Sequence, residues 1–281
     1  MTPHPPDGSP PGLLPAWARI GLWLGLAFLW LPVLLLVFYA FSGDPVPFRW
    51  GGFSLRWFRE LAADERLLEA AFLSLRIAAG AATLAMLLGG ATGWLLARGG
   101  AFRGRALLGA LSGAPLVLPE VVTGLSLLLL FVMLEAATGW PRGRGAGTIL
   151  LAHATLGAAY AAVVVQARLA RGGRELEEAA ADLGATPATV FRTVTLPLMA
   201  PALAASWLLA FTLSLDDVVL ASFLSGPAST TLPVALFSML RLGMTPKVNA
   251  LAVLILAAVG LALLLAAALT RGRVARGRGG D

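Results

Sequence analysis

The chain has 281 residues, of which 58% are hydrophobic and only 13% charged, whereas soluble domains are ordinarily about 45–50% apolar and about 25% charged. This composition and a mean hydropathy of +0.82 exclude an ordinary water-soluble fold. The net charge of +6 comes from basic residues scattered between apolar blocks, which favours membrane topology over nucleic-acid binding, and the absence of cysteine excludes disulfides and thiolate chemistry.

The N-terminal part of the sequence contains a tail and a first apolar block. Residues 1–18 are rich in proline and poor in apolar side chains, so we expect a disordered cytoplasmic tail there. The block from Arg19 to Phe41 is too long for the core of a signal peptide and has no small-residue cleavage site after it. It therefore predicts an uncleaved membrane helix, interrupted at Pro32.

A polar segment, residues 42–68, separates this block from the next. Its apolar residues recur at helical spacing and predict a short amphipathic helix at the outer membrane interface: Phe53, Trp57, Phe58 and Leu61. Further apolar blocks cover residues 69–97, 107–134, 148–167, 198–220 and 249–270, each near the ~20 residues that cross a bilayer. The sequence thus predicts an all-α integral membrane protein with six spans within residues 19–270.

The basic residues predict the orientation of these spans. The larger share of the 21 arginines and lysines lies on one side, in the loops 98–105 and 168–192 and in the tail 271–281. Because cytoplasmic loops carry the excess of arginine and lysine, we expect both termini in the cytoplasm and residues 271–281 to form a basic cytoplasmic tail. Residues 168–197 then form the longest cytoplasmic loop.

This loop has the pattern of two short helices joined by a turn. In the first, Glu178 and Asp182 lie four residues apart on one face, Ala179 and Ala180 leave a thin surface for close docking, and Gly184 ends the helix. In the second, a threonine is followed by Pro187, which is typical of a helix start. Such a bracket could pass force from a cytosolic partner to the fifth span; the alternative is a surface loop with ordinary caps.

The loop resembles a family motif: Glu-Ala-Ala, three residues, Gly, nine residues, an aliphatic residue, one residue, Leu-Pro. The matching positions are Glu178, Ala179, Ala180, Gly184, Val194, Leu196 and Pro197. This motif is that of permease subunits in binding-protein-dependent ATP-binding-cassette (ABC) importers. The resemblance implies a six-transmembrane-helix type I ABC importer permease fold in the bacterial cytoplasmic membrane. It also implies that these residues, with Asp182, form a coupling helix seated in a cleft of a separate ATPase subunit.

The same resemblance implies the partners. They are a pair of cytosolic ATPase subunits, a homologous second permease, and a periplasmic or extracellular substrate-binding protein. The chain itself would be neither an enzyme nor a cofactor-binding protein, since ATP would be bound by the separate subunit. The absence of a Gly-x-x-x-x-Gly-Lys-Ser/Thr phosphate loop agrees with that division.

Resemblance outside the motif points to the polyamine branch of these importers, and to putrescine permease subunits in particular. It lies in residues 114–127, 213–219, 225–227, 231–233 and 249–251. Two positions depart from the family pattern: Glu120 stands where aspartate is expected, which keeps the charge, and Lys247 stands where an acid is usual. The implied substrate is therefore a polyamine, putrescine or spermidine.

Three acids lie within or at the ends of predicted spans. Acids there cost roughly 2.5–3.5 kcal/mol near the bilayer centre, so they usually face a partner or a water-filled path. One hypothesis is that Glu120 and at least one of Asp216 and Asp217 line the outer mouth of a path and attract a polyamine cation. The alternative is structural: Glu120 pairs with Arg76, and the two aspartates cap the fifth span.

Pro115 and Pro119 predict a kink beside Glu120, while His153 is expected to be an interfacial side chain without a role. Two alternatives to a polyamine importer remain: an ABC importer for another small solute, and an ion-gradient-driven secondary transporter. The sequence has no visible internal repeat, which disfavours the latter.

Overall fold

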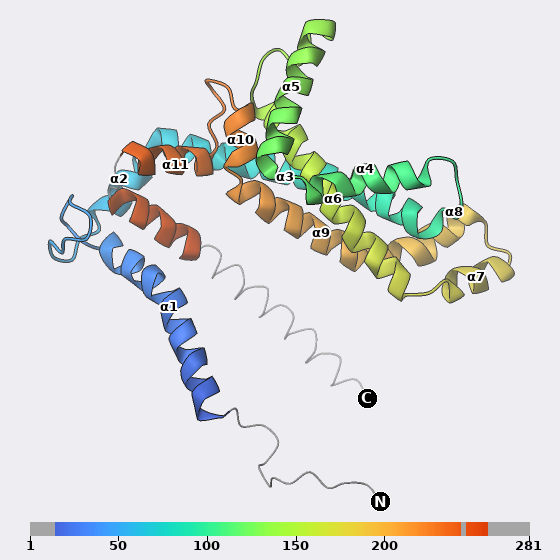
Figure 1. The fold of residues 1–281 in the computed structure, drawn as a ribbon, viewed down its shortest axis with the longest axis horizontal. Coiled ribbons are helices and arrows are strands. Elements are labelled where there is room, and N and C mark those ends of the chain that lie inside the picture. Colours follow the sequence, from blue (N-terminus) through green and yellow to red (C-terminus); the bar gives the residue numbers. More distant parts are fainter. Residues whose placement is uncertain (1–14, 243–245, 258–281) are drawn as a thin grey trace, which may run out of the picture. The chain divides into compact units, whose positions relative to one another are not determined.

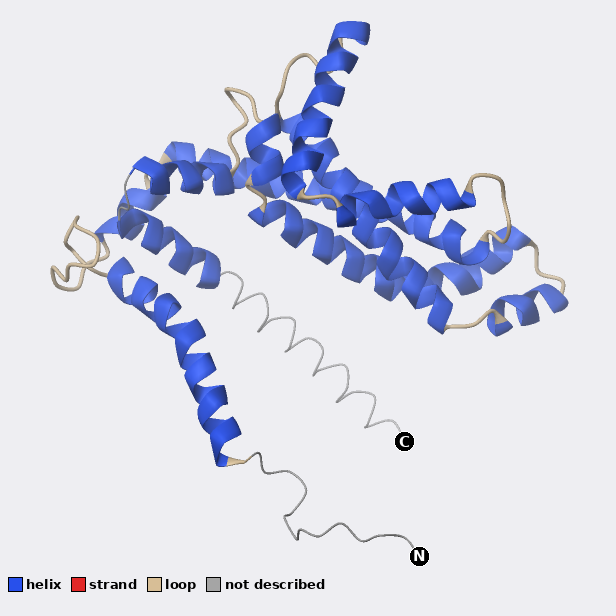
Figure 2. Cartoon of the chain, viewed as in Figure 1, coloured by secondary structure: helices blue, strands red, loops and turns tan. Residues whose placement is uncertain are grey.

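The computed structural model describes residues 15–242 and 246–257. Within these ranges the regular secondary structure is helical apart from one bridge between Ser42 and Phe53 (Figures 1 and 2). The helices are α1 (Ala16–Ala40), α2 (Arg56–Ala62), α3 (Glu65–Arg98), α4 (Arg105–Val117), α5 (Glu120–Thr138), α6 (Ala146–Arg171), α7 (Glu175–Asp182), α8 (Pro187–Val190), η1 (Phe191–Thr195), α9 (Leu196–Asp216), α10 (Val219–Leu224) and α11 (Leu232–Leu242), followed by an apolar helix at Pro246–Ala257. They form two compact units, residues 1–63 with 242–281 and residues 64–241.

Five helices in the described ranges are long and apolar enough to span a membrane: Trp17–Ala40, Glu65–Arg98, Glu120–Thr138, Ala146–Arg171 and Pro187–Asp216. They correspond to five of the six predicted spans. The sixth, predicted at 249–270, starts in the helix Pro246–Ala257, and its remainder lies outside the described residues. The predicted tail 271–281 and most of the tail 1–18 also lie outside them.

In the unit formed by the two ends of the chain, α1 is one helix of 25 residues that runs through Pro32. The predicted interruption is wrong, because a proline removes only its own N–H and the bonds on either side can keep the helix continuous. The predicted short helix is present as α2, but Phe53 lies before it, in the bridge with Ser42. Its Trp57 is buried against Ala40 and Ala250, and the indole Nε1 donates to the Ser42 carbonyl at 2.7 Å.

The larger unit is built on α3, α6 and α9, and small residues let these helices approach closely. A Cβ on Gly89 of α3 would lie 2.3 Å from the Ala158 carbonyl oxygen of α6, and one on Gly93 would lie 2.4 Å from that of Ala162. Only glycine fits at such distances. Membrane helices associate through close packing of this kind, because lipid supplies no hydrophobic force between them.

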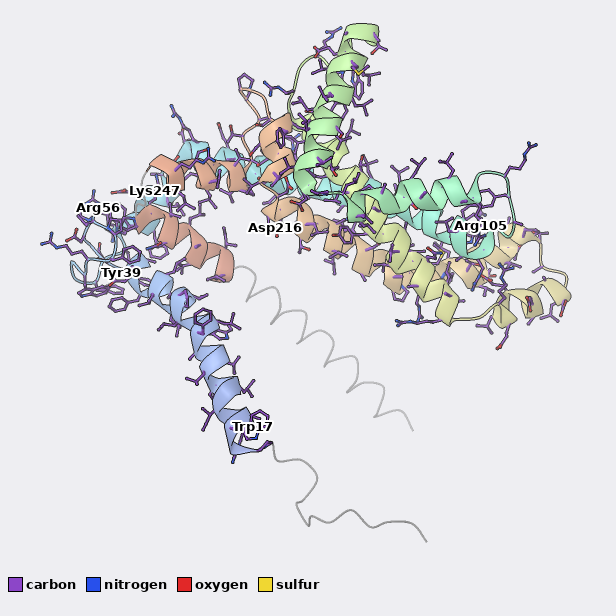
Figure 3. The ribbon with its side chains drawn as sticks, viewed as in Figure 1. Trp17, Tyr39, Arg56, Arg105, Asp216 and Lys247 are labelled. Carbon is purple, nitrogen blue, oxygen red and sulfur yellow. The ribbon has the colours of Figure 1, made fainter. Side chains whose placement is uncertain are left out.

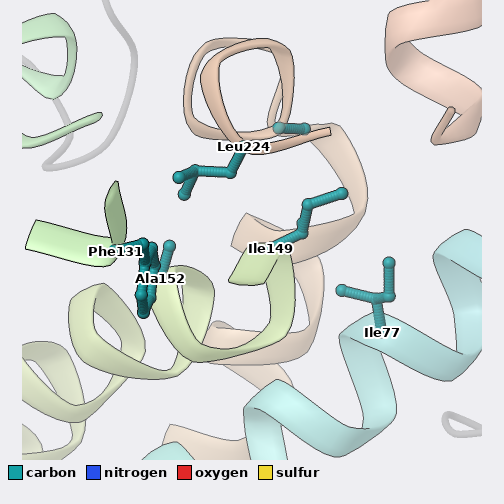
Figure 4. Packing of buried hydrophobic residues seen from close by; sticks show 6 residues of the cluster. Ile77, Phe131, Ile149, Ala152 and Leu224 are labelled. Atoms are coloured by element: carbon teal, nitrogen blue, oxygen red, sulfur yellow. The ribbon is translucent and has the colours of Figure 1, made fainter. Parts of the chain in front are cut away.

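A cluster of buried hydrophobic residues joins four helices of this unit (Figure 4). It contacts α3 nearer its start than the glycines do. Its buried residues come from α3, α5, α6 and α10: Ile77, Phe131, Ile149, Ala152, Ala221 and Leu224. Because α3 and α6 contribute to both this cluster and the glycine contacts, they form the frame on which the shorter helices are placed.

The third predicted span, 107–134, is not one helix. α4 ends at Val117, Leu118 and Pro119 are extended, and α5 begins at Glu120. The residue before a proline is driven away from helical backbone angles, which explains a complete break where we predicted a kink. Pro115, in contrast, remains inside α4. The fifth span likewise ends at Asp216, earlier than predicted, and α10 follows after a two-residue break.

Candidate functional site

The bracket predicted from the loop begins with α7, which is its first predicted helix. Three glutamates occupy its first turn, where the partial positive charge of the helix N-terminus favours acids. Gly184 ends the helix with φ +85°, a backbone conformation that favours glycine, and the Ala185 N–H donates to the Ala180 carbonyl at 3.1 Å. The predicted helix and its glycine stop are confirmed.

The second helix of the bracket is also confirmed, and it continues directly into a span. The Thr186 side chain accepts from the Thr189 N–H, and Pro187 follows at the first helical position. From there α8, η1 and α9 run without a break to Asp216. η1 is a turn of π-helix closed by the Leu196 N–H and the Phe191 carbonyl. The wider turn comes just before Pro197, which has no N–H to donate.

The motif residues divide between the two arms of this bracket. On α7 and its glycine stop, Glu178, Ala179, Asp182 and Gly184 are exposed, and Ala180 is half-buried. Leu183, next to them, is 90% exposed. On the adjoining helix Val194 is half-buried, while Leu196 and Pro197 are exposed. The outer side of α7 therefore carries acids beside apolar side chains, a surface suited to another protein.

Two residues outside the motif, Glu177 and Arg98, connect α7 to the rest of the unit. Oε2 of Glu177 lies 2.6 Å from Nε of Arg98 at the end of α3, and its Oε1 accepts from Thr195 Oγ1 at 2.7 Å. Above this pair lies a cleft of about 310 Å³ between α7 and α8–η1, with Trp94 and Phe191 in its wall. The sequence has no local signal for these contacts, because the partners lie far apart along the chain.

Glu120 lies at the start of a helix. It is the first residue of α5 and exposed, so it lies at a break between two helices and not within one continuous helix. An acid in the first turn of a helix is stabilised by the helix dipole without an ion-pair partner. Within the described residues Glu120 makes no ion pair with Arg76, whose guanidinium lies over the Phe72 ring at 5.6 Å from its centroid.

The two adjacent aspartates have different environments. The Asp217 side chain is 7% exposed, its Oδ1 accepts from the Ala221 N–H at 2.9 Å at the start of α10, and it lies 3.3 Å from Nε2 of His153. Nδ1 of His153 lies 2.6 Å from Ser214 Oγ. Asp216, labelled in Figure 3 at the end of α9, is exposed. Asp217 thus stabilises the turn between α9 and α10. Of the two aspartates, Asp216 is the one exposed to a solute.

The environment of His153 differs from the one predicted from the sequence. Its side chain is 2% exposed and joins α6 to the end of α9, so it is not an interfacial residue. Neither its place in the sequence nor its neighbours could have indicated this, because Ser214 lies 61 positions away.

In residues 15–242 and 246–257, no three histidine, aspartate or glutamate side chains come together as a metal site would require.

Residues 89–276, which hold the bracket and most of the spans, match the family model described as "Binding-protein-dependent transport system inner membrane component". The chain belongs to this family. It is 53% identical over 245 residues to the putrescine transport system permease protein PotI of Escherichia coli (strain K12), covering 87% of each chain. It is 39% identical over 230 residues to the spermidine/putrescine transport system permease protein PotC of Haemophilus influenzae, covering 82% of this chain and 87% of that one.

Solved structures share the fold of this permease at low sequence identity. A bacterial ABC transporter involved in the import of the acidic polysaccharide alginate matches with a TM-score of 0.65 and 14% identity, over 92% of this chain and 99% of that one. An amino acid ABC transporter matches with a TM-score of 0.54 and 16% identity, over 78% and 100%. The permease is thus a non-catalytic membrane component with an ABC importer fold.

Proposed function

We propose that this permease carries a polyamine, putrescine or spermidine, across the bacterial cytoplasmic membrane. The observation that carries the proposal is 53% identity, over 87% of both chains, to a protein named for putrescine transport. Such a permease would work with a homologous second permease, a pair of cytosolic ATPase subunits and an external substrate-binding protein. Both termini would lie in the cytoplasm.

The bracket 174–197 is proposed as the contact with the ATPase. The exposed face of α7 offers acids and apolar side chains to a partner, and Glu178, Ala179 and Asp182 lie on it. α8, η1 and α9 form one helical run from Pro187 to Asp216. A push on the tip of the bracket would therefore move a span directly, since a continuous helix transmits displacement along its axis.

The carboxylates proposed for the cation path are Glu120 and Asp216. Both are exposed and both lie where a helix begins or ends, Glu120 at the start of α5 and Asp216 at the end of α9. An ammonium group would find a carboxylate there without first breaking an ion pair. Asp217, buried against His153, is assigned the structural role of capping α10.

Uptake into proteoliposomes tests the proposal. The permease, its partner permease, the ATPase and the binding protein would be reconstituted with ATP inside the vesicles, and labelled putrescine, spermidine and an unrelated amino acid offered outside. Polyamine uptake that requires ATP and the binding protein is the expected result. Uptake of another solute alone would favour the second kind of ABC importer, and uptake that persists without ATP while an ion gradient is present would favour a secondary transporter.

A further inference from the structure

We propose that Glu177 is a positioning residue for transport, which ties the coupling helix α7 both to the end of α3 and to the π-helical turn η1. Movement of α7 then reaches two spans at once, α3 and α9. This inference rests on the proposed function, coupling through residues 174–197, and it identifies the side chains that pass the movement on.

The two oxygens of Glu177 hold one neighbour each. Oε2 lies 2.6 Å from Nε of Arg98, the last residue of α3, and Oε1 accepts from Oγ1 of Thr195 at 2.7 Å, the last residue of η1. The Glu177 and Arg98 side chains are 14% and 11% exposed, and Thr195 is 3% exposed. Water therefore competes little for these contacts. The contact with Arg98 is an ion pair, and the hydrogen bond from the Thr195 hydroxyl to the Glu177 carboxylate is of the stronger, charge-assisted kind.

The segment that leads into α7 is fastened to the same end of α3. The Arg98 guanidinium donates to the Gly173 carbonyl, and Nη2 of Arg174 donates to the carbonyls of Ala97 and Arg98 at 3.3 and 3.4 Å. The Ala97 and Arg98 carbonyls are among those that a helix leaves unpaired at its C-terminus. Arg105, labelled in Figure 3, satisfies another of them, the Leu96 carbonyl, at 2.6 Å. Arg105 at the start of α4 and Arg174 just before α7 thus both bind carbonyls at the end of α3.

The other arm of the bracket meets α3 through an aromatic pair. Trp94 of α3 and Phe191, the first residue of η1, lie edge to face with centroids 5.2 Å apart. Glu177 holds the last residue of η1 and Trp94 its first, so both ends of the π turn contact the α3–α7 assembly. A π turn carries an extra residue within a helix and is a point where hydrogen-bond register can change. Because η1 contacts both Glu177 and Trp94, a change of hydrogen-bond register there would be coupled to α7.

The adjacent glutamates of α7 therefore serve different partners. Successive residues of an α-helix point about 100° apart, so Glu178 is exposed on the docking side while Glu177 turns inward. The glycine contacts of α3 with α6 lie earlier in α3 than Arg98, at Gly89 and Gly93, and do not involve Glu177. Loss of the Glu177 contacts should therefore leave the spans packed. It should weaken the transmission of movement from the bracket to α3 and α9.

Two nearly isosteric variants test this, each in the complete reconstituted transporter. Glu177→Gln removes the charge opposite Arg98, and Thr195→Val removes the hydroxyl that Glu177 accepts from. The matched control is Glu175→Gln, in the same turn of α7 and exposed. Solute uptake and ATP hydrolysis are measured in the same vesicles, together with co-purification of the ATPase. A merely structural residue would alter the amount of transporter and leave the number of solutes moved per ATP unchanged.

We expect the ATPase to co-purify and hydrolyse ATP with Glu177→Gln and Thr195→Val, while solutes moved per ATP fall by about tenfold, in keeping with the loss of one strong hydrogen bond. Glu175→Gln should match the unmodified chain. The exchange of charges in Arg98→Glu with Glu177→Arg should recover part of the ratio lost by Glu177→Arg alone. An unchanged ratio in both isosteric variants would overturn the proposal.

The docking variant Glu178→Lys separates this result from failure of the proposed function. If Glu178→Lys still binds the ATPase and transports normally, the proposed coupling face is wrong, and the inference on Glu177 falls with it. If Glu178→Lys loses the ATPase while Glu177→Gln keeps a normal ratio, only the positioning role of Glu177 is wrong.

Discussion

Two pairs of adjacent acids in this permease are divided between an exposed and an enclosed side chain. Glu178 and Asp216 are exposed, whereas Glu177 contacts Arg98 and Asp217 contacts His153. Successive side chains on a helix point in different directions, and the backbone itself turns where a helix ends. Two adjacent carboxylates can therefore have entirely different surroundings. The two members of each pair carry the same charge, so their different roles come from their surroundings.

At the docking face, Glu178→Lys should abolish uptake while the permease remains inserted at its normal level. The change places a cation where α7 offers an anion to its partner. Uptake in cells, permease content of membranes and co-purification of the ATPase are the measurements. Glu175→Lys, in the same helical turn, is the control for the unfavourable effect of a cation near the N-terminus of α7. Normal ATPase binding and uptake by Glu178→Lys would contradict the assignment.

At the end of α9, Asp217→Ala should destabilise the permease by at least about 1 kcal/mol, the usual effect of removing a helix-capping side chain. It also leaves His153 without its carboxylate. The apparent Tm in detergent should fall by a few degrees. Asp216→Ala should keep that Tm and instead raise the polyamine concentration that gives half-maximal uptake. The opposite pattern would exchange the roles of the two aspartates.

At the scale of elements, the contact of α3 with α6 depends on the absence of side chains. Glycines at 89 and 93 bring the α3 backbone against carbonyls of α6, and Gly157 of α6 would meet Ala85 of α3 and Ala210 of α9 if it had a Cβ. Three helices therefore share one small-residue contact zone. A rigid frame at this zone gives the bracket and the shorter helices α4, α5 and α10 a fixed base.

The substitution Gly93→Ala should lower the apparent Tm of the purified permease, because its Cβ would lie 2.4 Å from the Ala162 carbonyl oxygen. Overpacking of this kind costs about 1–3 kcal/mol. Gly147→Ala, in the first turn of α6 with nothing within 4 Å of its Cβ, is the matched control and should not lower the Tm. Equal effects of the two changes would show that helix propensity, and not contact, governs stability here.

At the scale of the whole molecule, the predicted orientation places the bracket in the cytoplasm. The chain contains no cysteine, so a single introduced thiol reports its own position without competing labels. Ala179 on α7 and Arg142 in the loop between α5 and α6 are both exposed and are predicted on opposite sides of the membrane.

A membrane-impermeant thiol reagent added to spheroplasts should label Arg142→Cys at once and Ala179→Cys only after the membrane is permeabilised. The cysteine-free chain gives the background. The expected pattern follows from the excess of arginine in the loops 98–105 and 168–192. Labelling of Ala179→Cys from the outside would reverse the topology and remove the bracket from any cytosolic ATPase.

The amino-acid sequence by itself determined the helical membrane class, the positions of most spans, and the two helices of the bracket with their stop at Gly184 and start at Thr186. These features follow from local causes: hydropathy over one span length, a glycine with positive φ, and a capping side chain followed by proline. They need only residues that are near one another in the chain.

Tertiary structure alone decided which acids are enclosed. Glu177 with Arg98, and His153 with Ser214 and Asp217, come together from helices far apart in the sequence. It also decided how Pro115 and Pro119 differ, one within α4 and the other at a break, because a proline restricts its neighbour without dictating how the flanking helices pack. A local pattern can specify a helix, but its partners depend on how the whole chain packs.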